Sequence, residues 1–443
     1  MNQTFCGILV DHFQYRDGAL WCEQTPVARI AEAVGTPAFI YSAATLRDHY
    51  CRLAVGFAPL RPIICYSIKS CANLHVCRLL RELGAGFDVV SGGELARALE
   101  AGGDPAKIVF AGVGKTDDEI RAGIEAGIGW FNIESEAELE NLSAISAKLG
   151  RSVRAALRVN PDVDPKTHRY TSTGKKETKF GVDLERARRV FETFGRDAHV
   201  RLTGIHLHIG SPVNDVSSYV SAVTKATRLI DVLRAAGFTL DMLDIGGGFG
   251  AHYRGSEAPD AQAYAKAIVP LVEPYVAQGG LQVVIEPGRS ISGNAGILLS
   301  RVLYRKRGGE REFLIIDAGM TELIRPALYE AYHFMWPVAP AAGFVPEPRG
   351  ESARADGMVL YDVVGPICES GDFLAKERRL PPMERGDLLA VFTAGAYGMV
   401  MASNYNSRGR PPEVLVEGDS WRVIRRRESY DDLVGLERST PNG

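Results

Sequence analysis

The sequence has no long hydrophobic run and no strong excess of one charge. No stretch approaches the roughly 18 uninterrupted apolar residues that cross a bilayer, and residues 1–15 lack the basic region and apolar run of a secretory signal. The formal net charge is −3 over 443 residues, which argues against a polyanionic partner. We therefore expect a soluble cytoplasmic protein that binds neither membrane nor nucleic acid.

The sequence also lacks paired cysteines. It has seven cysteines, an odd number, which are spread over a long chain without any Cys-x-x-Cys pair. This pattern is unlike a disulfide framework or a zinc ribbon. We therefore expect no metal site, and we interpret all the cysteines except Cys368 as packing residues.

Strand-like and helix-like segments alternate over residues 62–286. The chain exceeds the roughly 250–300 residues of a single domain, so a large domain and a smaller one are expected. Helical patterns such as 92–101 and 135–149 separate eight β-rich runs, which is typical of an α/β protein with a (β/α)8 TIM barrel. We place the barrel at residues 37–296; an open doubly wound sheet is the alternative, because counting strands does not show closure. The eight runs are 62–68, 86–90, 107–111, 129–133, 153–159, 201–209, 240–245 and 281–286.

After residue 296 the chain changes to strand-like runs with few helices between them. We expect residues 1–36 and 297–443 to form a β-rich domain. The predicted strands are 313–316, 358–364, 388–392 and 414–416.

Lys69 stands where the first predicted barrel strand ends and a loop begins. The carboxyl ends of barrel strands carry the chemistry of that fold. A lysine there can be a surface charge, a phosphate clamp, or the amine that forms a Schiff base with a carbonyl cofactor such as pyridoxal 5'-phosphate (PLP). Taken alone, the surface charge is favoured, because most lysines are exposed.

The sixth strand ends in two histidines, and the seventh ends in a glycine run that suits a phosphate. His206 and His208 alternate and so point to opposite sides, with His208 nearer the mouth, although a lone histidine in a strand is more often a core residue. The run Gly246-Gly247-Gly248 lets backbone N–H groups converge on an anion. A dinucleotide loop would instead follow the first strand of a βαβ unit. A phosphate site after strands seven and eight is the recurrent arrangement in barrels.

The eighth strand ends in Glu286-Pro287-Gly288-Arg289. A carboxylate at this place can hold the protonated ring nitrogen of a pyridine cofactor, although a single Glu/Arg pair is usually structural. Lys69, the glycine run and Glu286 together supply an aldehyde partner, a phosphate cradle and a ring-nitrogen partner. That combination matches the requirements of PLP.

These residues belong to a series of motifs that resembles the PLP-dependent decarboxylases of fold type III, which join an alanine-racemase-like barrel to a β domain. Within that family, the chain is most similar to the members that act on diaminopimelate. The combination is highly specific, because the motifs keep one order over residues 66–397. They are Tyr66-Ser67-Ile68-Lys69, residues 172–181, His206-x-His208-Ile209-Gly210-Ser211, Gly246-Gly247-Gly248, Glu286-Pro287-Gly288-Arg289, Arg325-Pro326-Ala327-Leu328-Tyr329, Cys368-Glu369-Ser370-Gly371-Asp372 and Gly395-Ala396-Tyr397.

The resemblance implies roles for barrel residues around PLP. Lys69 would bind the cofactor covalently, His208 would stack on its ring, and Glu286 would bond the pyridine nitrogen. That carboxylate also separates decarboxylases from the racemase relatives, which place an arginine there. The cofactor-binding residues on the phosphate side would be Ser211, Gly247, Gly248, Gly288 and Arg289.

The resemblance also implies a homodimer, in which the Cys368–Glu369 segment of one subunit completes the active site of its partner. Cys368 would protonate the α-carbon after CO2 leaves, and Glu369 would bind the distal amine of the substrate. The remaining substrate-binding residues would be Arg289 and Arg325 at the distal carboxylate, and Tyr329 and Tyr397 around the substrate, with Tyr397 also contacting the cofactor.

An acid and an arginine at the far end of the site suit meso-diaminopimelate better than ornithine, lysine or arginine. We expect decarboxylation of meso-2,6-diaminopimelate to L-lysine and CO2, the last step of lysine biosynthesis. The alternatives are a decarboxylase of a related carboxylated amine, such as a polyamine or siderophore precursor, and a non-catalytic decarboxylase-like binding protein. Four residues depart from the common family pattern, with expected effects on phosphate-side packing or substrate choice: Ser67, Ser70, Cys71 and Pro212.

Overall fold

The computed structural model describes residues 11–163, 179–255, 258–346, 349–350, 353 and 355–438. The chain forms two compact units. The barrel unit comprises residues 47–250 and 258–290, and the β-rich unit comprises residues 1–46, 251–257 and 291–443. Most of the motif 172–181, namely residues 172–178, lies outside the described residues, as does Cys6.

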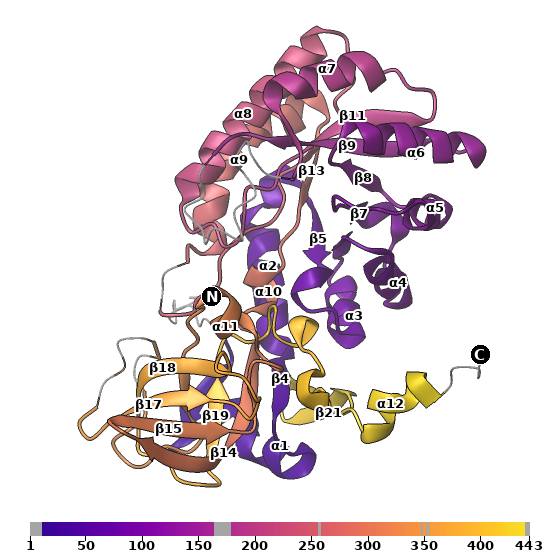
Figure 1. The fold of residues 1–443 in the computed structure, drawn as a ribbon. Coiled ribbons are helices and arrows are strands. Elements are labelled where there is room, and N and C mark those ends of the chain that lie inside the picture. Colours follow the sequence, from indigo (N-terminus) through magenta and orange to yellow (C-terminus); the bar gives the residue numbers. More distant parts are fainter. Residues whose placement is uncertain are drawn as a thin grey trace. The chain divides into compact units, whose positions relative to one another are not determined.

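The barrel unit is built on a closed sheet of eight parallel strands (Figure 1). The order is β9-β11-β12-β13-β5-β6-β7-β8, and β8 pairs with β9 to close the ring. The predicted TIM barrel is therefore confirmed, and the open sheet is excluded. The strands are β5 (Ile63–Ser67), β6 (Gly86–Val89), β7 (Ile108–Phe110), β8 (Trp130–Ile133), β9 (Val153–Asn160), β11 (Val200–His206), β12 (Met242–Asp244) and β13 (Gln282–Ile285), with the short β10 (Val182–Asp183) paired to β9.

The helices of the barrel unit lie outside its strands (Figure 1). Seven of them begin after an Asn, Ser, Thr or Asp whose side chain accepts a backbone N–H of the first turn, which explains where these helices start. The seven helices are α3 (Leu74–Glu82), α4 (Gly92–Glu100), α5 (Asp117–Ala126), α6 (Glu136–Lys148), α7 (Leu184–Phe194), α8 (Val216–Ala235) and α9 (Ala261–Gly279). The long helix α2 (Ala43–Gly56) precedes β5.

Barrel strands are covered on both faces, so polar residues within them can be fully buried. All four residues of β6 and of β8 are buried, including Asp88 and Asn132. A buried polar group requires a hydrogen-bonding partner. We therefore expect Asp88 and Asn132 to have polar partners inside the barrel.

The β-rich unit contains a sheet of order β18-β17-β15-β14-β4-β20-β21, to which β19 and β16 attach, and a separate sheet β1-β2-β3. The predicted β-rich region is therefore confirmed. The strands are β1 (Phe13–Arg16), β2 (Ala19–Cys22), β3 (Thr25–Pro26), β4 (Ala38–Ser42), β14 (Gly296–Gly308), β15 (Arg311–Ile316), β16 (Met335–Pro337), β17 (Val359–Val364), β18 (Phe373–Leu380), β19 (Leu388–Val391), β20 (Glu413–Glu417) and β21 (Ser420–Arg425). The helices are α1 (Val27–Val34), α11 (Arg325–Tyr329) and α12 (Tyr430–Arg438), and the short α10 (Arg289–Ser292) begins in the barrel unit and ends in the β-rich unit.

Strand β4 differs from the expected start of the barrel at residue 37. It pairs antiparallel with β14 and parallel with β20, so it belongs to the sheet of the β-rich unit. All five of its residues are buried, which is also the pattern of a barrel strand. The local sequence of β4 therefore does not indicate which sheet it joins.

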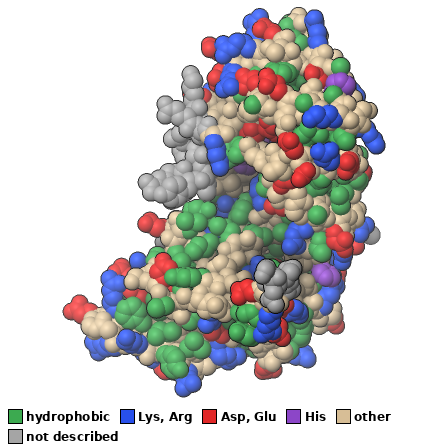
Figure 2. Space-filling view, turned by 45° about the vertical axis from the view of Figure 1, so that its right-hand side comes forward, with side chains coloured by type: hydrophobic (Ala, Val, Ile, Leu, Met, Phe, Trp, Pro, Cys, Tyr) green, Lys and Arg blue, Asp and Glu red, His purple; other side chains and the backbone are tan. Residues whose placement is uncertain are grey.

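Charged side chains of both signs are interspersed over the face shown in Figure 2. This distribution fits the small net charge of −3. Among the helices that the structure describes, none combines the length and the apolar character needed to cross a membrane.

Candidate active site

Lys69 lies in a short 3-10 turn, residues 68–70, directly after β5. Its Nζ is 2.5 Å from Asp88 Oδ2 at the end of β6, and Ser67 Oγ donates a hydrogen bond to the same oxygen. The lysine side chain is 31% exposed, whereas that of Asp88 is fully buried. Burial and the charge of Glu286 raise the pKa of Asp88, against the lowering effect of Lys69. Lys69 is therefore an accessible amine with a fixed acidic neighbour, unlike a solvated surface lysine.

The glycine run after β12 forms a tight loop in which side chains do not fit. A Cβ on Gly247 would lie 2.1 Å from Glu286 O, and one on Gly248, whose φ is +98°, would lie 2.2 Å from Gly210 O. Val213 N–H donates to Gly248 O at 2.8 Å. Within the described part of the chain, the buried N–H groups of Gly248 and Phe249 have no protein acceptor. Since buried amides are costly without an acceptor, the loop fits a phosphate.

The other residues predicted on the phosphate side lie against the same strand ends. Arg289 is only 6% exposed, and its Nε donates to Ser211 Oγ at 3.1 Å. Gly288 packs on the turn that carries the lysine, because a Cβ on it would meet Ser67 Cβ at 2.8 Å. The loops after β5, β11 and β13 therefore meet, as the barrel predicts.

His208 follows β11 and faces the glycine loop. The N–H of Gly247 points at His208 Nδ1 over 3.5 Å, a long contact. Burial lowers the pKa of His208 well below its usual range, and the positive charges of Arg158 and Lys69 lower it further. The imidazole is therefore neutral near pH 7, and a neutral imidazole suits stacking on a cofactor ring.

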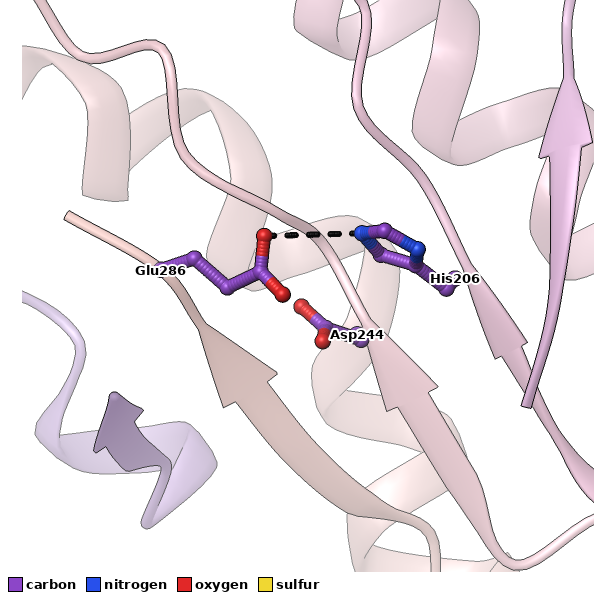
Figure 3. A group of neighbouring side chains, drawn as sticks. All are labelled: His206, Asp244 and Glu286. Atoms are coloured by element: carbon purple, nitrogen blue, oxygen red, sulfur yellow. Dashed lines mark ion pairs between the residues drawn. The ribbon is translucent and has the colours of Figure 1, made fainter. Parts of the chain in front are cut away.

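Three polar side chains meet inside the barrel at the ends of β11, β12 and β13 (Figure 3). They are His206, Asp244 and Glu286, which are at most 3% exposed. His206 Nε2 lies 3.4 Å from Glu286 Oε2, within the distance of an ion pair. Asn132 Nδ2, from β8, donates to Glu286 Oε1 at 3.2 Å and to Asp244 Oδ2 at 3.1 Å. Glu286 is thus held from two sides.

The charges in this cluster are divided unequally. Burial acts to raise the pKa of Glu286, but the neighbouring His206, with a further contribution from Lys69, outweighs burial and holds the pKa well below its usual range. Burial and the neighbouring Glu286 raise the pKa of Asp244 well above its usual range. One ring nitrogen of His206 and one carboxylate oxygen each of Asp244 and Glu286 lie within 4.8 Å of one another. A metal ion would also suit this spacing. The ionised Glu286 is equally what a cationic ring nitrogen requires.

The remaining predicted site residues lie in the β-rich unit. Arg325 and Tyr329 are the first and last residues of α11, and the Arg325 side chain is buried. Cys368 and Glu369 are exposed, and Asn406 Oδ1 accepts a hydrogen bond from the Cys368 N–H. Tyr397 has a φ of +56°, in the left-handed region that is unfavourable for a bulky residue.

Motif reasoning missed three residues that hold the predicted ones: Asp88, Asn132 and Asp244. Each is a polar residue in a strand whose other residues are buried and apolar. A polar residue in such a strand is a signal that was available in the sequence, because burial without a partner is costly.

The four departures from the family pattern lie close to Lys69 or to the phosphate side. Ser67 is one of the two donors to Asp88, and Ser70 Oγ donates to Ser67 O at 2.9 Å. Cys71 is buried, and its carbonyl accepts a hydrogen bond from Tyr66 Oη at 3.1 Å. Pro212 follows Ser211 in the loop after β11. Of these four residues, Ser67 has the most direct link to the lysine, because it donates to Asp88, the partner of Lys69.

Comparisons with known proteins identify the family that this chain is similar to. Residues 44–293 match the family described as "Pyridoxal-dependent decarboxylase, pyridoxal binding domain". The chain is 45% identical to the diaminopimelate decarboxylase of Pseudomonas aeruginosa, over 98% of this chain and 100% of the relative.

Two solved structures are similar over nearly the whole chain. The diaminopimelate decarboxylase of M. jannaschii in complex with L-lysine is 35% identical, with a TM-score of 0.89 over 98% of this chain and 99% of that one. The enzyme of Helicobacter pylori complexed with L-lysine is 37% identical, with a TM-score of 0.86 over 93% and 99%. The expected cofactor and fold are confirmed by these matches.

Proposed function

Because this chain belongs to the diaminopimelate decarboxylase family, we propose that its barrel unit binds PLP through Lys69 and that its β-rich unit binds the substrate. The reaction is the PLP-dependent decarboxylation of meso-2,6-diaminopimelate to L-lysine and CO2, the last step of lysine biosynthesis. The observation that carries the site assignment is the convergence of Lys69, the glycine loop and the ionised Glu286 on the strand ends of one closed barrel.

Bound PLP supplies a ring that accepts the electron pair left when CO2 departs. Lys69 provides the amine for covalent attachment, and Asp88 Oδ2 accepts a hydrogen bond from Lys69 Nζ and can take up its proton. Glu286, ionised and held by Asn132, would keep a proton on the ring nitrogen. His208, being neutral, would cover the ring without adding a charge.

On the substrate side, Arg325 would bind the distal carboxylate and Glu369 the distal amine. The thiol of Cys368 would deliver a proton to the α-carbon after CO2 leaves. We further propose that these two surface residues act in the site of a partner subunit within a homodimer, which their exposure supports. A cytoplasmic location also belongs to the proposal, because the six cysteines that the structure describes form no disulfide with one another.

The test is CO2 release from PLP-loaded protein offered meso-diaminopimelate, L-lysine, L-ornithine, L-arginine and carboxynorspermidine. We expect turnover of meso-diaminopimelate alone. Lys69→Ala should abolish turnover and the label that borohydride fixes at residue 69, whereas Lys148→Ala, at an exposed lysine on α6, should leave both unchanged. Near-native activity of the Lys69→Ala variant would show that this lysine has another role.

Sharing of the site between subunits has a separate test. Lys69→Ala and Cys368→Ala chains, each inactive alone, are mixed after mild dissociation. If each site combines residues from two subunits, random reassociation restores roughly a quarter of the wild-type activity, because half of the dimers then hold one intact site. No recovery in mixtures that do reassociate would place both residues in the site of one chain.

A further inference from the structure

Arg325 is a buried cation with two fixed neighbours in the β-rich unit. Its residue is only 7% exposed, and a charge with so little access to water needs partners. Its Nη1 lies 2.8 Å from Nε2 of His333. Its guanidinium carbon lies 4.6 Å from the centroid of the Tyr253 ring. One edge and one face of the guanidinium are therefore constrained.

The partners of His333 determine its tautomer. Nδ1 lies 2.9 Å from the backbone oxygen of Phe392, which can only accept, so the proton is on Nδ1. Arginine can only donate, so Nε2 of His333 accepts from Arg325. His333 is therefore a neutral imidazole with one nitrogen committed to the backbone and the other to Arg325.

The sheet holds His333 rigidly. The residue is 0% exposed, and its backbone oxygen accepts a hydrogen bond from Arg378 Nη1 at 2.7 Å. Phe392, its acceptor, donates its own N–H to Phe334 O at 2.8 Å. The Tyr253 ring meets the imidazole edge to face, with centroids 5.4 Å apart and planes at 89°. Because the imidazole is fixed by these contacts, it also fixes the direction in which the Arg325 guanidinium points.

A neutral acceptor has a specific advantage here. A carboxylate in place of His333 would also orient Arg325, but it would cancel the positive charge that an anionic ligand must meet. A neutral imidazole orients the guanidinium fork and leaves its charge available.

We infer that His333 is a positioning residue, which aims the guanidinium of Arg325 at the carboxylate that remains on the product, while Tyr253 supports the guanidinium face. This inference rests on the proposed function, in which Arg325 binds the distal carboxylate. Selection for substrates that keep a carboxylate at that end then depends on His333 as well as on Arg325.

Two substitutions separate the two bonds of His333. His333→Gln places an amide oxygen near the position of Nε2 and can still accept from Arg325. His333→Asn places an amide N–H near the position of Nδ1 and can still donate to Phe392 O, but offers Arg325 no acceptor. Both variants lose the ring, and they differ in which of the two bonds they keep: His333→Gln keeps the bond to Arg325, and His333→Asn keeps the bond to Phe392 O.

The measurement is calorimetric binding of L-lysine and of cadaverine to the PLP-loaded proteins, with kcat, KM and Tm recorded in parallel. L-lysine carries a carboxylate and cadaverine does not. We expect His333→Asn to weaken L-lysine binding and raise KM about tenfold, with kcat within about threefold, and His333→Gln to change both by less than about threefold. Cadaverine binding should be unchanged in both variants.

Equal L-lysine affinity in wild type and His333→Asn would overturn the inference, and so would a parallel loss of both ligands with a large fall in Tm in both variants. If neither variant folds, Tyr253→Leu provides the second approach: it should weaken L-lysine binding several-fold relative to Tyr253→Phe and spare cadaverine. Wild-type protein that does not turn over meso-diaminopimelate would instead overturn the proposed function itself.

Discussion

Tyr219 on α8 offers a direct test of how the barrel holds its glycine loop. Its hydroxyl donates to Gly247 O at 2.7 Å, and the residue is 1% exposed. Its ring stacks on Phe249, with centroids 5.4 Å apart, and meets Tyr264 edge-on at 5.5 Å. Burial raises the pKa of Tyr219 well above its usual range, so the hydroxyl remains a donor at every working pH.

Tyr219→Phe removes this one donor and keeps both ring contacts. A buried carbonyl that loses its partner costs about 1–3 kcal/mol. Part of the cost reduces the stability of the free protein and the rest reduces cofactor affinity, because Gly247 belongs to the proposed phosphate cradle. We expect the free energy of unfolding to fall by about 1 kcal/mol and the Kd of PLP to rise about three- to tenfold.

The assay is titration of cofactor-free protein with PLP, followed by visible absorbance, together with urea unfolding. Tyr275→Phe is the matched control, because the Tyr275 hydroxyl on α9 donates to an exposed side chain, Asp231, at 2.8 Å, away from the loop. If Tyr219→Phe and Tyr275→Phe bound PLP equally well, the glycine loop would not depend on this hydrogen bond, and the reasoning would be refuted.

Two further predictions concern a glycine and an acid. Gly247→Ala should abolish most PLP binding, because the new Cβ would lie 2.1 Å from the backbone oxygen of Glu286. Gly114→Ala is the control and should bind PLP normally, because nothing lies within 4 Å of its new Cβ. The visible absorbance of the purified proteins measures the bound PLP. At Glu428, burial acts to raise the pKa, but hydrogen bonds from Arg410 and Asn404 lower it to about 2, against an unfolded value near 4.5. The ion pair therefore stabilises the fold above pH ~4.5 and loses its effect as pH falls toward 2. Glu428→Gln should cost about 2–3 kcal/mol at pH 7 by urea unfolding, with a smaller difference at pH 3; a difference independent of pH would contradict this assignment.

The barrel strands were predictable because each is a short apolar run between helices. The predicted run 62–68 corresponds to β5 (Ile63–Ser67), and the run 281–286 to β13 (Gln282–Ile285). Closure was not predictable in this way, because the pairing of β8 with β9 involves no local pattern. Strand β4 shows the same limit, since full burial is equally expected in a barrel and in the sheet that it joins.

The site was predictable only where a residue type stands at a strand end within a motif. Lys69 and Glu286 satisfied that condition. Asp88 and Asn132 did not, because each is a single polar residue within a strand. They acquire their roles only when the closed barrel brings β6 and β8 within hydrogen-bonding distance of the loop after β5 and the end of β13.

The position of β4 has a consequence for how the chain is made. β4 pairs with β14 and, in parallel, with β20, so Phe39 faces Glu413 across the sheet, and Tyr41 Oη donates to the Glu413 carboxylate at 2.8 Å. During synthesis, β4 leaves the ribosome well before its partner β20, because all the barrel strands lie between them in the sequence. The barrel strands, in contrast, lie within residues 63–285. Contacts of such long range form slowly. The barrel strands can therefore pair during synthesis while β4, whose five residues are all buried in the finished sheet, still lacks its parallel partner β20.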